Sequence, residues 1–153
     1  MKIYEFVHEG KLLNLNEALN MKARSSFLYN KNKQQTEEDI MWSIKSQLRG
    51  LSIADKPFST VFTWFVSSRR SDPDNVASAV KYIFDAAQKC GFIKNDNYLA
   101  TSGGFMHRFV LSPDRMPRVH VQFLVGGKMQ IIGIADDNSD KELIQEWTLQ
   151  KTA

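Results

Sequence analysis

The sequence predicts an α+β fold: one domain with a mixed β-sheet, two main helices packed on it, and a short C-terminal strand and helix extension. Strand-like segments rich in aromatic and β-branched residues are interleaved with two helix patterns. Of the 153 residues, 42% are hydrophobic and 24% are charged, as in ordinary globular proteins. We assign residues 1–125 to the domain and residues 126–153 to an extension packed on it.

The first third of the chain predicts a strand, a loop and a helix. Met1–Val7 alternates apolar and polar residues, which indicates a strand. The polar, Asn-rich residues 14–35 are expected to form a basic loop. Thr36 is expected to cap a helix, because acidic residues follow it in the first turn, and Gly50 would end it. The predicted buried face of this helix consists of Ile40, Ile44, Leu48 and Leu51.

The middle of the chain predicts a central strand followed by a second helix. Phe58–Val66 is aromatic and β-branched, as expected of a buried strand. Asp72 is placed to cap a helix whose first residue is Pro73, where the missing N–H has no cost. The helix should run to about Cys90 and stop at Gly91.

The remaining elements are shorter. Strands are expected at Phe105–Leu111 and Val119–Val125, with a further strand at Lys128–Ala135. Ser139 and Glu142 are spaced like a capping box and predict a short helix that reaches Trp147.

Composition excludes several classes of protein. Cys90 is the one cysteine, so neither an intramolecular disulfide nor a multi-cysteine zinc site can form. The three histidines, His8, His107 and His120, lack metal-ligand spacing. No apolar run approaches the roughly 18 residues of a membrane span, and the N-terminus lacks the apolar stretch of a signal peptide. We therefore expect no membrane partner and a cytoplasmic location.

The charge is unevenly distributed. Residues 1–70 hold 11 Lys and Arg against 7 Asp and Glu, whereas residues 129–153 hold 2 against 5. Within the first region, four cations lie close to two aromatic residues, Phe27 and Tyr29; the cations are Lys22, Arg24, Lys31 and Lys33. Such a segment either binds phosphates and unstacked bases or is a solvated loop with its aromatic residues in the core.

A pair of carboxylates marks the start of the second helix. Asp72 and Asp74 repel each other, and a hard divalent cation such as Mg²⁺ would offset that repulsion. Arg69 and Arg70 precede them, and Lys81 follows two turns later. This pattern suits either helix capping within a salt-bridge network, or a phosphodiesterase, whose carboxylates hold a metal while its cations hold the polyanion.

The ordered motifs resemble the RusA-like Holliday-junction resolvase family, especially its phage-borne branch. The similar segments are Asn14-x-Asn16-Glu17, Arg70-Ser-Asp72-Pro-Asp74-Asn75, a helix with Lys81 and Asp85, and Gly91-Phe-Ile-Lys-Asn95-Asp96-Asn97-Tyr98.

That resemblance implies a homodimeric, Mg²⁺-dependent endonuclease that cuts branched DNA such as four-way junctions. It assigns metal binding to Asp72, Asp74 and Asp96. The family commonly has a lysine where this chain has Ser78, so Lys81 is the nearest candidate for the catalytic lysine. It also commonly has Asp-Asp where this chain has Asn95-Asp96.

Chain geometry restricts how Asp96 could join the other two acids. A helix over residues 73–90 would be about 27 Å long, while the six residues from Cys90 to Asp96 span at most about 21 Å. Asp96 therefore approaches Asp72 and Asp74 only if the helix ends early or the chain doubles back along it. Otherwise, a partner subunit supplies it.

The sequence thus predicts metal-assisted hydrolysis of a phosphodiester, with Mg²⁺ as the cofactor and Mn²⁺ as an alternative ion. Arg69, Arg70 and the basic segment Lys22–Lys33 would hold the DNA backbone, and Lys81 would balance developing negative charge. Two other functions remain open. One is a module that binds branched or single-stranded DNA without cutting it, and the other is a small-molecule phosphoesterase.

Overall fold

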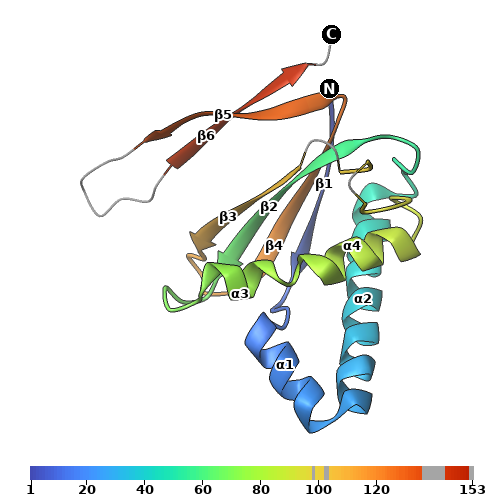
Figure 1. Cartoon of the computed structure of the whole chain (residues 1–153), viewed down its shortest axis with the longest axis vertical. Coiled ribbons are helices and arrows are strands. Elements are labelled where there is room, and N and C mark those ends of the chain that lie inside the picture. The colour runs from blue at the N-terminus through green and yellow to red at the C-terminus, as the bar shows by residue number, and fades with distance from the viewer. Residues whose placement is uncertain (98, 102–103, 136–143, 152–153) are drawn as a thin grey trace.

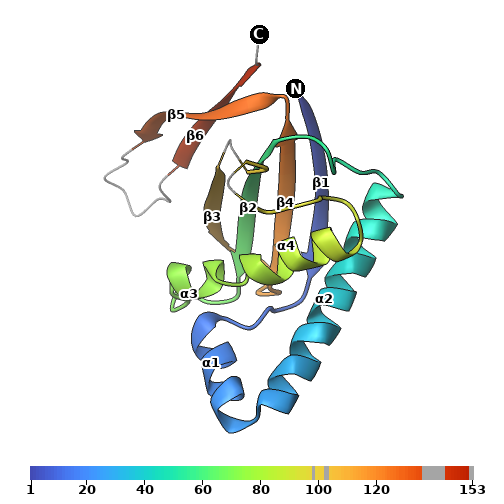
Figure 2. The same ribbon diagram turned by 45° about the vertical axis from the view of Figure 1, so that its right-hand side comes forward.

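Four strands form a mixed sheet, and helices cover one of its faces (Figures 1 and 2). The computed structural model describes residues 1–97, 99–101, 104–135 and 144–151. The elements of the N-terminal half are β1 (Lys2–Glu9), α1 (Leu15–Arg24), α2 (Ser26–Leu48) and β2 (Phe58–Val66). Those that follow are α3 (Pro73–Ala77), α4 (Val80–Lys89), β3 (Phe105–Leu111), β4 (Arg118–Val125), β5 (Gly127–Ala135) and β6 (Ile144–Lys151). The predicted α+β class is confirmed.

The main sheet has the strand order β1-β4-β2-β3. β4 pairs antiparallel with β1 and β2, while β2 pairs parallel with β3, so β2 is an interior strand as its composition predicted. Because β2 and β3 run in parallel, their connection must cross from one end of the sheet to the other. That connection contains α3 and α4, and the predicted catalytic residues Asp72, Asp74, Lys81 and Asp96 all lie on it.

The core lies between the sheet and the helices α2 and α4. The core side chains that are at most 1% exposed include Phe6, Ile40, Phe62, Ile83 and Phe123. Burying each stabilises the fold by about 1.5–3 kcal/mol. α2 is also fixed to the outer edge of β1, because the amide of Gln47 donates to the carbonyl of Val7 (2.7 Å) and accepts from its N–H (2.8 Å). The sheet and these helices therefore form a rigid base for the β2–α3 loop.

The predicted basic loop over residues 14–35 is wrong, and so is the predicted helix start at Thr36. Asn14 caps α1 by accepting a hydrogen bond from the N–H of Glu17 (2.9 Å), and Ser25 caps α2 by accepting one from the N–H of Leu28 (3.2 Å). Residues 15–36 include no buried side chain, so α1 and the first half of α2 lack the apolar stripe that marks a packed helix. The capping spacing at Asn14 and Glu17 was the local signal that could have shown the first helix.

The second predicted helix is two helices. α3 ends at Ala77 and α4 begins at Val80, with Ser78 and Ala79 in a tighter turn between them. The hydroxyl of Ser78 donates to the carbonyl of Asn75 (2.7 Å), a bond that competes with regular helix geometry. Gly91 ends α4 with a left-handed φ of 76°, as predicted.

The C-terminal extension is a strand pair. β5 and β6 form a separate two-stranded antiparallel sheet, which follows β4 directly. The predicted strand at Lys128–Ala135 is confirmed, but the predicted helix is wrong where it reaches Trp147, which lies opposite Ile131 in the pair. Residues 136–143, with the predicted capping box, lie outside the described residues. Ladder pairing with β5 overrides the local helix signal.

Candidate active site

Asp72 stands at the start of α3 with a carboxylate that does not cap the helix. It occupies the N-cap position that the sequence predicted, with Pro73 as the first helical residue, but its side chain makes no capping hydrogen bond. Its Oδ2 instead accepts a hydrogen bond from Nδ2 of Asn75 at 3.3 Å. Asp72 and Asp74 are both exposed, and among the described residues neither forms an ion pair. Simple helix capping therefore does not explain this pair of carboxylates.

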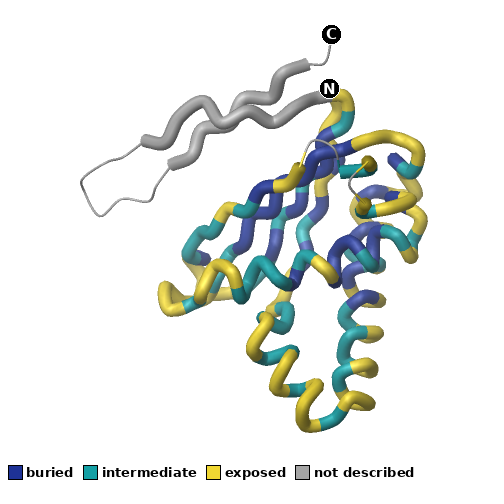
Figure 3. Tube along the Cα trace, in the orientation of Figure 1, coloured by how far each residue is buried: buried dark blue, intermediate teal, exposed yellow. Residues whose placement is uncertain are grey.

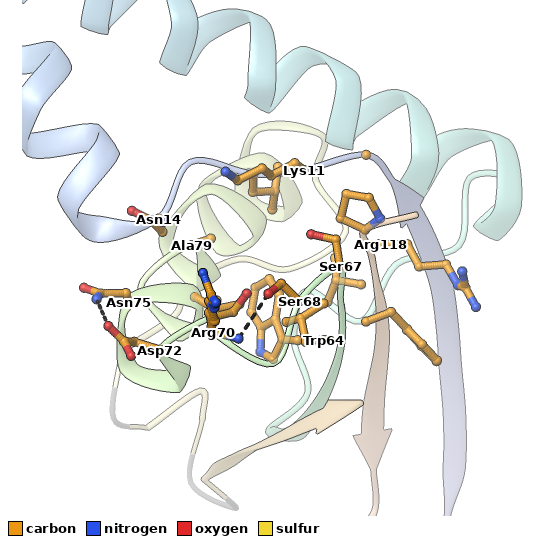
Figure 4. Close-up of a pocket in the computed structure, with 18 of the residues that line it drawn as sticks. Lys11, Asn14, Trp64, Ser67, Ser68, Arg70, Asp72, Asn75, Ala79 and Arg118 are labelled. Atoms are coloured by element: carbon orange, nitrogen blue, oxygen red, sulfur yellow. Dashed lines mark hydrogen bonds between the residues drawn. The ribbon is translucent and has the colours of Figure 1, made fainter. Parts of the chain in front are cut away.

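Asp72 lines a pocket of about 370 Å³ where the β2–α3 loop meets the β1–α1 connection (Figure 4). Trp64 and Val66 of β2 contribute to its apolar lining. Two cations and three side-chain amides contribute to its polar surface: Lys11, Arg70, Asn14, Asn16 and Asn75. Asp72 is the one acidic side chain in the described lining.

The cations Lys11 and Arg70 against one carboxylate in the described lining favour an anionic ligand in this pocket, and the ammonium of Lys11 also pairs with Glu17 (2.5 Å). The volume of the pocket is in the range of small-ligand sites, which suits a group the size of a nucleotide. The guanidinium of Arg118 lies 4.2 Å from the centre of the Phe65 ring and 3.4 Å from a carboxylate oxygen of Asp114. Because Arg118 is paired with Phe65, its guanidinium lies on the face of the sheet opposite to Trp64 and the pocket.

A second polar cluster lies on α4, α2 and the segment after α4. The Nζ of Lys81 lies 2.8 Å from Asp85 and 3.9 Å from Asp96. Lys33 of α2 approaches both Asp85 (3.6 Å) and the buried Glu37 (3.8 Å), and Lys89 also pairs with Glu37. The cluster therefore ties together α2, α4 and the loop that carries Asp96.

Lys81 keeps its positive charge. Its hydrogen bond to Asp85 raises the pKa of the Lys81 ammonium above the ordinary value, and the charges of Asp85 and Asp96 act in the same direction. The side chain is 64% exposed. Lys81 can thus offer a fixed cation to a phosphate, whereas its raised pKa makes it a poor general base.

The structure brings Asp96 to Lys81, but it does not assemble the three predicted metal ligands in one protomer. The chain doubles back along α4, which is one of the routes that chain geometry allowed, and Asp96 ends beside the first turn of that helix. Among the described residues, no group of three or more His, Cys, Asp or Glu side chains could hold a metal ion. Asp72 and Asp74 are thus separate from Asp96 within the chain.

Asp72 and Asp74 nevertheless fit a hard cation. Both are exposed carboxylates without an ion-pair partner in the described chain, and Mg²⁺ takes one or two protein carboxylates while keeping several waters. The side-chain oxygen of Asn75 is a further donor of the same hard type. These residues fit an Mg²⁺ site that a third acid would complete.

The predicted DNA-binding residues lie in three places. Lys22 and Arg24 are in the last turn of α1, and Lys31 and Lys33 are in α2. Arg69 and Arg70 are exposed in the β2–α3 loop, where Arg70 lines the pocket. Lys33 is engaged with Glu37 and Asp85, so it is less available to a ligand than the others.

Sequence reasoning missed one pocket cation. Lys11 follows β1 and reaches the pocket because the β1–α1 connection meets the β2–α3 loop there. No local motif marks this residue, since a single Lys beside a strand is ordinary. Asn14 and Asn16 had been noted only through the family resemblance.

No known family model matches this chain, and no curated protein is significantly similar to it. Within the described residues, no helix is both long and apolar enough to cross a membrane. The candidate site therefore rests on its own geometry and on the resemblance of its motifs.

Proposed function

We propose that this protein is a Mg²⁺-dependent endonuclease that hydrolyses phosphodiesters in branched DNA such as four-way junctions. The observation that carries the proposal is the carboxylate of Asp72, which does not cap its helix, at a pocket lined by the cations Lys11 and Arg70. A phosphodiesterase needs this combination, because carboxylates alone would repel the polyanion that they have to approach.

In this proposal Asp72, Asp74 and Asp96 hold the metal. A Mg²⁺ ion held there, for which Mn²⁺ is an alternative, would polarise a phosphoryl oxygen and lower the pKa of a water molecule. Arg70 and Lys11 bind the phosphate and its neighbours and fix the strand relative to Asp72. Lys81 carries a permanent charge that offsets the negative charge developing on the phosphoryl oxygens. Hydrolysis adds the oxygen of water to phosphorus and releases one deoxyribose hydroxyl.

A homodimer would complete this site, with Asp96 and Lys81 of one subunit beside Asp72 and Asp74 of the other. The separation of the acids within the chain supports this arrangement. A two-fold dimer also matches the two-fold symmetry of a four-way junction. Since contacts to phosphates do not depend on the base sequence, the enzyme would select for the shape of the DNA. Such a protein would work in the cytoplasm of a bacterial or phage-infected cell.

One observation favours a second candidate, a module that binds branched or single-stranded DNA without cutting it. The three acids do not form a metal site within the protomer, while the cations are exposed. Such a module would bind junctions equally well in EDTA and in Mg²⁺ and would leave the strands intact.

The deciding experiment incubates the purified protein with a labelled synthetic four-way junction in Mg²⁺ or in EDTA. We expect cleavage in Mg²⁺ only, and little on a linear duplex of the same sequence. Asp74→Asn should reduce cleavage at least about a hundredfold, since it removes a metal ligand, and should leave junction binding intact or tighter. Asp55→Asn is a matched control, because Asp55 is 89% exposed and lies outside the site. Near-normal nicking by Asp74→Asn would overturn the metal assignment.

The salt dependence of activity distinguishes a small-molecule phosphoesterase from a DNA endonuclease. DNA affinity should fall steeply as the salt concentration rises, because bound cations displace condensed counterions from the DNA. Turnover of a small nucleotide phosphodiester would depend only weakly on salt. Junction cleavage that is insensitive to salt would therefore contradict the proposed DNA substrate.

A further inference from the structure

The helical hairpin made by residues 15–36, which we name the arm, extends beyond the end of the sheet (Figures 1 and 3). It consists of α1 and the first half of α2, and none of its residues is buried. Four large apolar side chains are exposed on it: Leu15 (44%), Leu19 (55%), Phe27 (74%) and Leu28 (55%). The arm therefore presents apolar surface that no part of the described chain covers.

The most exposed of these side chains lies at the tip of the arm. Only Ser25 separates α1 from α2, so Phe27 and Leu28 occupy the first turn of α2 at the bend. The hydroxyl of Ser25 accepts a hydrogen bond from the N–H of Leu28 at 3.2 Å, which fixes this turn. Tyr29 has a different role, because it is half-buried and the ammonium of Lys22 lies 5.9 Å from the centre of its ring. Phe27 is thus the aromatic ring that the arm offers outward.

Charge indicates what covers the tip. The arm carries four cations and one acid, Glu17; the cations are Lys22, Arg24, Lys31 and Lys33. Two copies of the arm packed against each other would bring like charges together, which opposes a contact between two arms at this tip. The partner must match both the positive charge of the arm and its exposed apolar side chains. A polyanion that also has flat apolar surfaces does so. Nucleic acid is such a partner, since phosphates bind the cations and bases stack on the ring.

We propose that the tip of the arm is a wedge that enters the branch point of a DNA junction, with Phe27 stacked on an unpaired or weakly stacked base and Leu28 beside it. The inference rests on the proposed function for its substrate, branched DNA. Apolar side chains that insert between bases are an established way of holding distorted DNA, and the branch point is where unstacking costs least. Lys22, Arg24 and Lys31 hold the flanking phosphates.

The test compares Phe27→Ala with Trp42→Ala in the full-length protein. Trp42 is a matched control, because it is 73% exposed on the same helix but outside the arm. Binding is measured in EDTA, so that no strand is cut, on a four-way junction with 2-aminopurine at the branch point and on a linear duplex. We expect Phe27→Ala to weaken junction binding about tenfold, the loss typical of one base–aromatic stack. Duplex binding should stay unchanged, and the 2-aminopurine fluorescence change should disappear.

Phe27→Tyr should restore both signals, because it keeps a ring that can stack. Equal behaviour of Phe27→Ala and Trp42→Ala would overturn the wedge, as would sedimentation showing that Phe27→Ala dissociates a dimer, since a second copy would then cover the tip. Failure of the wedge is separable from failure of the nuclease. If Phe27→Ala leaves Mg²⁺-dependent cleavage unchanged, the nuclease proposal holds and the wedge fails. If Phe27→Ala weakens binding but no cleavage occurs, only the wedge is supported.

Discussion

The ammonium group of Lys81 lies 3.9 Å from the carboxylate of Asp96, although the two residues are separated by nearly the whole of α4 and by the turn at Gly91. The segment after α4 must therefore run back along the helix to its first turn. This places the two parts of the proposed site, the pocket at Asp72 and the cluster at Lys81, on the connection between β2 and β3. Several measurable consequences follow from that arrangement.

Mixing two inactive variants should restore part of the nuclease activity. If Asp74 and Asp96 of different subunits form one site, a heterodimer of Asp74→Asn and Asp96→Asn chains contains one intact site and one doubly defective site. Random mixing would then recover about a quarter of the wild-type sites. Cleavage of the junction by variants mixed under exchange conditions is the measurement. No recovery, with exchange demonstrated by differently sized tags, would place each complete site within one chain.

Arg70 should contribute to DNA affinity through charge. Replacing it by Gln removes one phosphate contact, so junction binding should weaken at every base sequence and the slope of log affinity against log salt should decrease by about 1. Arg49→Gln is the control, because Arg49 is exposed at the end of α2, away from the pocket. Titrations at several salt concentrations give both quantities. An unchanged slope for Arg70→Gln would remove it from the DNA contacts.

Glu37 should be important for stability. Its side chain is 2% exposed and pairs with Lys33 and Lys89, which are 37% and 56% exposed. Glu37→Gln should lower the free energy of unfolding by about 2 kcal/mol, less than the 3–5 kcal/mol for breaking a fully buried pair because water reaches both lysines. Glu38→Gln, at the neighbouring exposed position, should change it little. Urea unfolding measures both, and equal effects would contradict the role assigned to Glu37.

Acidification should weaken the fold through two histidines. Burial lowers the pKa of His8 and of His107 below the ordinary value of 6.5. The unfolded chain then binds protons more readily than the native state, so their contribution to stability is complete above about pH 6.5 and declines as the pH falls toward the lowered values. In addition, Nδ1 of His107 accepts a hydrogen bond from the indole N–H of Trp64 at 2.9 Å, which requires the neutral ring.

Urea unfolding at pH 7.5 and pH 5.5 tests this dependence. His107→Asn keeps a hydrogen-bond acceptor but does not titrate, so its loss of stability between the two pH values should be smaller than that of the wild type. His120→Gln is the control, because His120 pairs with Glu5 on the surface. Equal losses in all three proteins would show that other groups control the acid sensitivity.

The sequence alone determined the features that depend on local chemistry. Three local predictions are confirmed: the strand at Phe58–Val66 from β-propensity, a helix start at Asp72 and Pro73 from a fixed φ, and a helix end at Gly91 from a left-handed residue. The single helix predicted between those two points is two helices. The carboxylate pair and its neighbouring arginines were likewise visible in the sequence. Local signals failed for the arm, because helices that bury nothing lack the apolar periodicity by which helices are recognised.

Only the tertiary structure decided which distant groups meet. Lys11 reaches the pocket of Asp72 because β1 and β2 both pair with β4, a pairing made by backbone hydrogen bonds that carry no motif. The strand at Ile144–Lys151 likewise exists because β5 supplies its ladder partners. Asp96 meets Lys81 rather than Asp72, since the direction of the returning chain is set by packing against α4. The sequence gives the chemical type of each side chain, whereas the distance between two side chains far apart in the sequence depends on the folded structure.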